Sequence, residues 1–131
     1  MKHWRNPEVF DSLSSSKINA VKAKLIGDSA LKSYGGQDDY SESKNTLTLV
    51  FGRPLTDDDF NYDDATYTWA ARPKKGLVKN LKDIIIRNMS KYPDIESNVS
   101  YVGGYIWNPG RGDSDICVYV KMNLDYFMDE T

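Results

Sequence analysis

The chain has 131 residues but only one cysteine and one histidine. With Cys117 alone, neither a disulfide within one chain nor a zinc site of several cysteines can form. His3 stands near the N-terminus, so a hydrolytic triad would depend on a residue of the tail. Cys117 falls inside a predicted strand without a neighbouring base, which is typical of a packing thiol. These absences argue against an enzyme, and the single thiol favours synthesis in the cytoplasm.

Long hydrophobic runs and a strong net charge are also missing. The longest apolar runs, such as Ile84-Ile85-Ile86, are far shorter than a membrane span, and the N-terminus lacks the apolar core of a signal peptide. The net charge is −2, from 17 basic and 19 acidic residues. Dedicated nucleic-acid-binding domains are strongly basic, so this balance argues against that class. We therefore expect a globular chain of one domain without membrane contact, metal or cofactor.

The first third of the chain shows helical spacing and then a polar stretch. Residues 1–27 are predicted as an N-terminal helical segment, in which residues 7–26 form two short helices or one broken helix, interrupted or capped at Ser14-Ser15-Ser16. The apolar side carries Ile18, Val21 and Leu25, and the expected solvent side carries Lys17, Lys22 and Lys24. Residues 28–45 are poor in apolar side chains, and we expect a polar loop.

Residues 46–126 carry the predicted sheet and its main helix. Alternation predicts strands at 46–51, 66–71, 99–107 and 116–124, of which the first ends at Gly52 to Pro54. A stripe of apolar residues predicts a helix over 76–92, which Pro93 ends. Gly103-Gly104 predicts a bulge or a close backbone contact. The economical fold is a single α+β domain, 1–131, with a small antiparallel sheet and one or two helices packed on one face.

An acidic stretch between the first two strands is the first candidate interaction site. Five acidic residues fall within the eight positions from Asp57 to Asp64. Part of the spacing matches an EF-hand loop, but Tyr62 replaces the glycine of its turn and Thr68 the bidentate glutamate. We interpret it as a solvated loop without a specific metal, which can meet a basic partner. The candidate residues are Asp57, Asp59, Asp63 and Asp64.

The predicted hairpin turn after residue 107 is the second candidate site. Trp107, Asn108 and Arg111 bring an aromatic ring and a guanidinium, which are side chains enriched at binding hot spots. Trp107 is equally compatible with burial at the end of its strand. The basic residues between 74 and 91 are interpreted as the solvent face of the helix, with contact to phosphates or an acidic surface as the alternative.

The order of elements in the second half adds a resemblance. A strand (66–71), an amphipathic helix (77–92), Pro93-Asp94-Ile95 with Val99, a glycine-containing strand, a polar turn and a final strand follow one another. In this order and hydrophobic pattern, residues 66–126 resemble the tail-terminator family of tailed phages, whose members close the end of a tail tube as a ring. The resemblance implies a homo-oligomeric virion component and transfers no site residue. Residues before 46 have no clear counterpart in that family.

These observations lead to three hypotheses. The absence of catalytic groups, together with three tryptophans and nine tyrosines, favours a non-enzymatic structural or assembly protein that contacts copies of itself and neighbouring assembly proteins. The alternative is a small phage-type inhibitor or adaptor that binds a host defence protein through the acidic loop. The third is an enzyme whose site the sequence does not reveal. A phage tail or neck component would be located in the virion.

Overall fold

The computed structural model describes six stretches of the chain, which are residues 13–27, 31–33, 38–41, 43–61, 72–107 and 114–128. The helices in these stretches are α2 (Ser15–Ile26), α3 (Leu77–Met89) and α4 (Pro93–Glu96), with single 3₁₀ turns η2 (Asp57–Asp59) and η4 (Leu124–Phe127). The strands are β1 (Lys32–Ser33), β2 (Asp39–Ser41), β3 (Thr46–Pro54), β4 (Phe60–Asn61), β5 (Arg72–Pro73), β6 (Val99–Trp107) and β7 (Asp115–Asn123).

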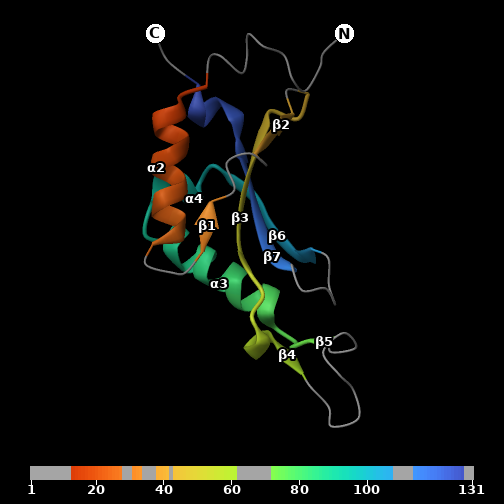
Figure 1. Ribbon diagram of the computed structural model, residues 1–131. Coiled ribbons are helices and arrows are strands. Elements are labelled where there is room, and N and C mark those ends of the chain that lie inside the picture. Colours follow the sequence, from red (N-terminus) through yellow and green to blue (C-terminus); the bar gives the residue numbers. More distant parts are fainter. Residues whose placement is uncertain are drawn as a thin grey trace.

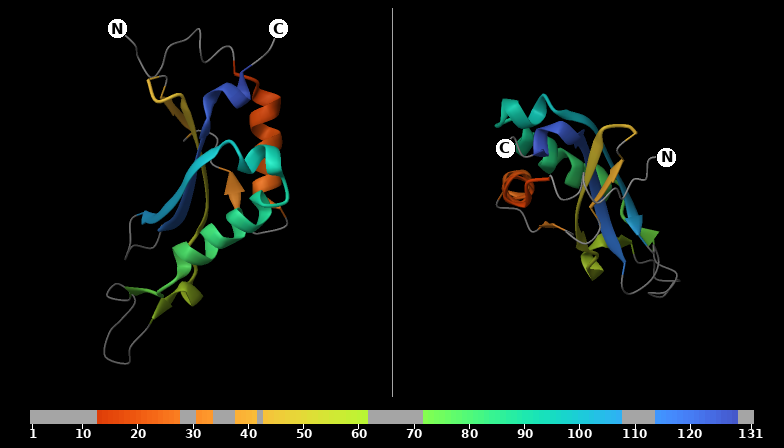
Figure 2. Two further views of the ribbon diagram at one scale, coloured as in Figure 1. Left: turned by 180° about the vertical axis from the view of Figure 1, so that it is seen from behind. Right: turned by 90° about the horizontal axis from the view of Figure 1, so that it is seen from above.

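The main sheet is antiparallel and has five strands, in the order β1-β3-β7-β6, with β2 also paired to β3. The strands β4 and β5 form a separate pair beyond the end of that sheet (Figure 1). The helices α2 and α3 pack on each other and lie on the same side of the sheet (Figures 1 and 2). This arrangement confirms the predicted α+β class with helices on one face.

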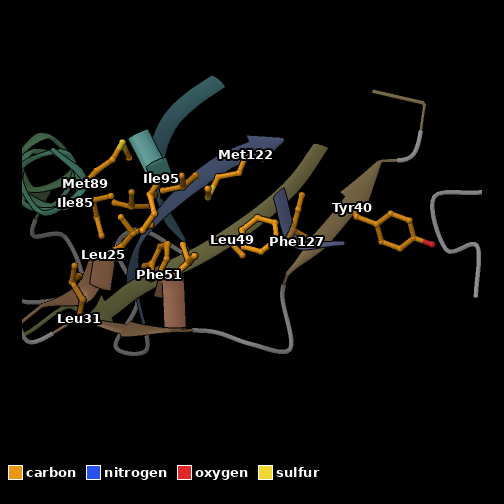
Figure 3. Close-up of a cluster of buried hydrophobic side chains, with 14 of the residues drawn as sticks. Leu25, Leu31, Tyr40, Leu49, Phe51, Ile85, Met89, Ile95, Met122 and Phe127 are labelled. Carbon is orange, nitrogen blue, oxygen red and sulfur yellow. The ribbon is translucent and has the colours of Figure 1, made fainter. Parts of the chain in front are cut away.

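The core lies between the sheet and these two helices (Figure 3). Alternate residues of β7 point into it, and all four are fully buried: Ile116, Val118, Val120 and Met122. Their partners in β3 include Leu49 and Phe51, and α3 contributes Leu81, Ile85 and Met89. The predicted helical stripe is therefore the core side of α3, where each large apolar side chain gains roughly 1.5–3 kcal/mol from burial.

Lys22 corrects the prediction for α2. We expected this residue on the solvent side, but it is only 5% exposed and its ammonium pairs with the Asp38 carboxylate. Asp38 also accepts a hydrogen bond from the backbone N–H of Val50. Burial raises the pKa of the Asp38 carboxyl, and the hydrogen bond and charge of Lys22 oppose that rise. A buried charge of this kind requires a partner, and here that partner comes from the segment predicted as a loop.

Other boundaries also differ from the predictions. The segment 28–45 contains the short strands β1 and β2, and β3 continues through Gly52 to Pro54 because β7 pairs with it over its full length. The helix α3 ends at Met89, before the predicted limit, and Pro93 begins α4. The predicted strand 66–71 and the part of the first helical segment before residue 13 lie outside the described residues.

Candidate interaction surface

The side of the sheet that faces away from α2 and α3 carries exposed aromatic rings. The register of β6 on β7 aligns Tyr101, Tyr105 and Trp107 with outward positions of β7, whereas Val102 and Ile106 pair with core residues. Tyr101 is 53% exposed, Tyr105 46% and Trp107 50%. We call this side, with its outward residues from β6 and β7, the open face. Neighbouring exposed aromatic rings of this kind mark interaction sites more often than single ones do.

Three tyrosine rings on the open face form one cluster. Tyr119 of β7 lies opposite Gly103, between the rings of Tyr101 and Tyr105, with centroid distances of 5.9 Å and 6.4 Å. A Cβ atom on Gly103 would lie 2.4 Å from the Tyr119 ring, so the glycine makes room for it. This confirms a close contact at the glycine pair, while the register shift in β6 falls instead between Val99 and Tyr101.

Among the described strands, β6 is also a long edge of the main sheet. Within the described residues it pairs only with β7, so its outer backbone groups have no strand beside them. Its nine residues include no charged side chain and no proline. Natural edge strands usually carry a lysine, a proline or a bulge, or stay very short, because a long free edge pairs with other chains. The register shift before Tyr101 leaves the stretch from that residue to Trp107 regular and open.

Asp59 of the acidic stretch forms hydrogen bonds within the fold. Its carboxylate accepts two hydrogen bonds from the Arg53 guanidinium, at 2.8 Å and 3.0 Å, and one from the backbone N–H of Thr56 at 2.7 Å. These bonds, with Arg53 first, lower the pKa of Asp59 to about 2. Its neighbours Asp57 and Asp58 are exposed. They are the described acids of this stretch that remain open to a basic partner.

The remaining predicted site residues divide between described and undescribed parts of the chain. Trp107 is half exposed at the end of β6 rather than buried. Asp63, Asp64, Asn108 and Arg111 lie outside the described residues. Among described residues, the two predicted sites lie at the same end of the sheet but on different strands, since Trp107 and Pro54 both pair with Asp115 and Asp57 follows Pro54 in η2.

No protein-family model, curated protein or solved structure matches this chain. The candidate surface consequently rests on geometry and chemistry. No helix in the described stretches is long and apolar enough to cross a membrane. Across the same stretches, no three His, Cys, Asp or Glu side chains are grouped as a metal site would require. Cys117 is buried, as predicted, and burial raises the pKa of its thiol, which makes it a poor nucleophile at neutral pH.

Five of the six basic residues between 74 and 91 are exposed, as the solvent-face interpretation predicts, and Lys82 is half-buried. Part of this basic side borders a groove. Lys24 of α2 joins Arg87 and Lys91 around a groove of about 500 Å³ beside Tyr92. The Lys24 ammonium lies 5.2 Å from the centroid of the Tyr92 ring. All three cationic groups are on exposed residues, where water screens their charge, so the groove is a weaker candidate than the open face.

The tyrosines of the open face were missed by sequence reasoning. Their alternation with Val102 and Ile106 was visible, but it does not say which side of a strand the helices cover. It also does not say that β6 is an edge, because that depends on the order of strands in the sheet. The closest signal in the sequence was Gly103, since a glycine inside a strand often marks a close approach by a ring.

Proposed function

We propose that this protein is a non-enzymatic assembly protein that acts through protein–protein contacts, and that its first partner is a second copy of itself bound through β6. The observation that supports this most directly is the edge of β6 that no described strand covers, nine residues without charge or proline beside the exposed rings of the open face. Strand addition at such an edge satisfies the outer backbone groups of both partners.

The sequence of β6 suits pairing about a twofold axis. Gly103 is the middle residue of the strand, and an antiparallel pair centred there aligns residues 101–105 of both copies, which lie beyond the register shift. Tyr101 then lies opposite Tyr105 of the partner copy. Aromatic pairs across neighbouring strands contribute roughly 0.2–1 kcal/mol each. The resulting contact is the same on both subunits, which is the geometry of a closed dimer.

The resemblance of residues 66–126 to phage tail terminators leads us to propose a phage tail or neck as the setting of this assembly. A ring requires head-to-tail contacts between two different surfaces, whereas pairing through β6 alone closes at two copies. The number of copies in solution therefore separates a dimer from a ring. The inhibitor hypothesis remains a proposal. It depends on Asp57 and Asp58, because the Asp59 carboxylate is already hydrogen-bonded to the Arg53 guanidinium.

Light scattering coupled to gel filtration tests the role of β6. The wild-type chain should give the mass of a dimer, and the double variant Tyr101→Lys, Tyr105→Lys should weaken dimerisation at least tenfold, since it places lysines opposite one another across the axis. Ile86→Lys is the matched control, because Ile86 is a large exposed apolar residue (43%) on α3. It should leave the dimer intact.

Three results would contradict this proposal. A wild-type chain that stays monomeric at the highest soluble concentration would show that the protein does not associate with itself. If the double variant folds, as judged by circular dichroism, and keeps the mass of a dimer, then β6 does not form the dimer contact. A larger assembly that neither variant alters indicates a ring built from other surfaces.

A further inference from the structure

A small cavity on the open face lies next to the tyrosine cluster, at the end of β6. It measures about 190 Å³ and is lined by Tyr105, Trp107, Asp115 and Cys117. The register explains why these four meet, since Tyr105 pairs with Cys117 and Trp107 with Asp115 on adjacent strands. Pockets for drug-sized ligands measure roughly 300–1,000 Å³. This cavity therefore has room for one group of about the size of a single side chain.

The walls of the cavity combine aromatic rings with one carboxylate. Tyr105 and Trp107 are about half exposed, while the Cys117 thiol is nearly covered, with 4% of the residue exposed. Asp115 is partly buried, and within the part of the chain that the structure describes it has no ion pair and no side-chain hydrogen bond. A carboxylate that has no cationic partner among the described residues, with two aromatic side chains beside it, gives the cavity a negative potential.

That combination selects cations over neutral groups. Ring faces attract ammonium and guanidinium groups, most strongly in the case of tryptophan. A neutral apolar group would fill the same space but would strip water from the Asp115 carboxylate without replacing its interactions, which costs free energy. A cationic group replaces that water with an ion pair.

We propose that this cavity is a binding site for a single organic cation, an ammonium or guanidinium group of the kind that lysine and arginine side chains carry. The site shares Tyr105 with the dimer contact proposed above, but strand pairing uses the outer backbone of β6, so the cavity stays on the open face. It also assigns a role to the exposed position of Trp107 and to the charge of Asp115, which pairs with no cation among the described residues.

A titration of the full chain followed by ¹H–¹⁵N NMR tests the proposal. The reporter is the indole N–H signal of Trp107, assigned by its disappearance in Trp107→Phe. The probes are choline and its neutral carbon isostere, dimethylbutanol, which share shape and differ in charge. Choline should bind at least tenfold more tightly than the neutral isostere. Asp115→Asn should weaken choline at least tenfold and leave the isostere unchanged.

Two further variants complete the design. Trp107→Ala removes the indole reporter, so this variant is followed through the backbone amide signals of Tyr105 and Asp115, and it should abolish binding of both probes. Tyr101→Ala, which removes an exposed ring of β6 outside the cavity lining, should change neither affinity. Capped peptides with one central lysine or arginine, compared with free butylammonium and butylguanidinium, identify the source of the cation. Peptides that bind as tightly as the free ions indicate a partner protein, and binding of the free ions alone indicates a small molecule.

Three outcomes would overturn the inference. Equal affinity for choline and dimethylbutanol would show an apolar pocket without charge selection. An Asp115→Asn variant with a native spectrum and undiminished choline binding would show that the carboxylate does not contribute to binding. Choline-induced shifts spread over exposed acids such as Asp57, with none at Trp107, would show non-specific association. The double lysine variant of β6 is left out of this test because it replaces Tyr105 of the cavity wall; the mass of each variant used here is measured beside its titration, which keeps loss of the dimer distinguishable from loss of the cation site.

Discussion

Replacement of Asp59 by Asn should destabilise the fold by about 2 kcal/mol, even though Asp59 lies in a stretch that reads as a solvated acidic loop. The pKa of this carboxyl falls from 3.8 to about 2 in the folded chain. Each tenfold change in proton affinity corresponds to about 1.4 kcal/mol, so the folded state favours the ionised group by about 2 kcal/mol. The Asp59 side chain is 9% exposed and that of Arg53 is 25% exposed, so partial screening by water makes this figure an upper value.

Urea denaturation monitored by circular dichroism measures the effect. The matched control is Asp57→Asn, two residues away on an exposed position, which should change the unfolding free energy by less than about 0.5 kcal/mol. An amide at position 59 still accepts one hydrogen bond but carries no charge for Arg53. If both variants lose the same free energy, the bonds between Arg53 and Asp59 contribute nothing, and the reasoning from the lowered pKa is wrong.

The same ion pair predicts the direction of a pH effect. The folded-state pKa of Asp59 is lowered, so its stabilisation is complete above pH 3.8, the ordinary value, and is lost as the pH falls toward about 2. The wild-type chain should lose more free energy than Asp59→Asn over that interval. Parallel pH profiles for the two chains would contradict this assignment.

Two other predictions follow from close contacts and hydrogen bonds. Gly104→Ala should cost about 1–3 kcal/mol of unfolding free energy, because its Cβ would lie 2.9 Å from a carbonyl oxygen of the β7 backbone. Gly103→Ala should cost less, since the obstructing atoms belong to the ends of tyrosine rings that can turn; equal costs would contradict this order. Burial and a hydrogen bond of 2.6 Å to Asp94 raise the pKa of Tyr126 to about 12. The difference between alkaline absorbance titrations of wild type and Tyr126→Phe should show that midpoint, and a midpoint near 10 would exclude the bond in solution.

The parts of the fold that sequence reasoning recovered are those whose signals are local. The predicted strand 99–107 matches β6, and the predicted 116–124 differs from β7 by one residue at each end, because alternation within each strand is strong. The stripe on α3 was equally clear. By contrast, β1 and β2 have two and three residues, too few to show a period, and they depend on β3 for their pairing.

The candidate interaction surface was harder to predict from the sequence than the fold, because the contacts that define it join residues far apart in the chain. The charge of Lys22 predicted a solvent position, and its partner Asp38 lies 16 residues along the chain. In the same way, Asp59 looked like its acidic neighbours until Arg53 was placed beside it. The tyrosine cluster requires the register between β6 and β7, which no single segment contains. Sequence patterns predicted which residues are apolar enough to pack, but the strand order decides which rings remain outside.

The two edges of the sheet explain why self-association through β6 should stop at two copies. A long, uncharged free edge in a monomer is an aggregation hazard, because further chains can add to it without limit. When the β6 strands of two copies pair with each other, neither copy keeps its long β6 edge open to a further chain. The outer borders of the combined sheet are then formed by β1 and β2, of two and three residues, which are too short to recruit another strand. The asymmetry between the edges therefore favours a closed dimer over a fibre, and it makes the double lysine variant of β6 a test of solubility as well as of stoichiometry.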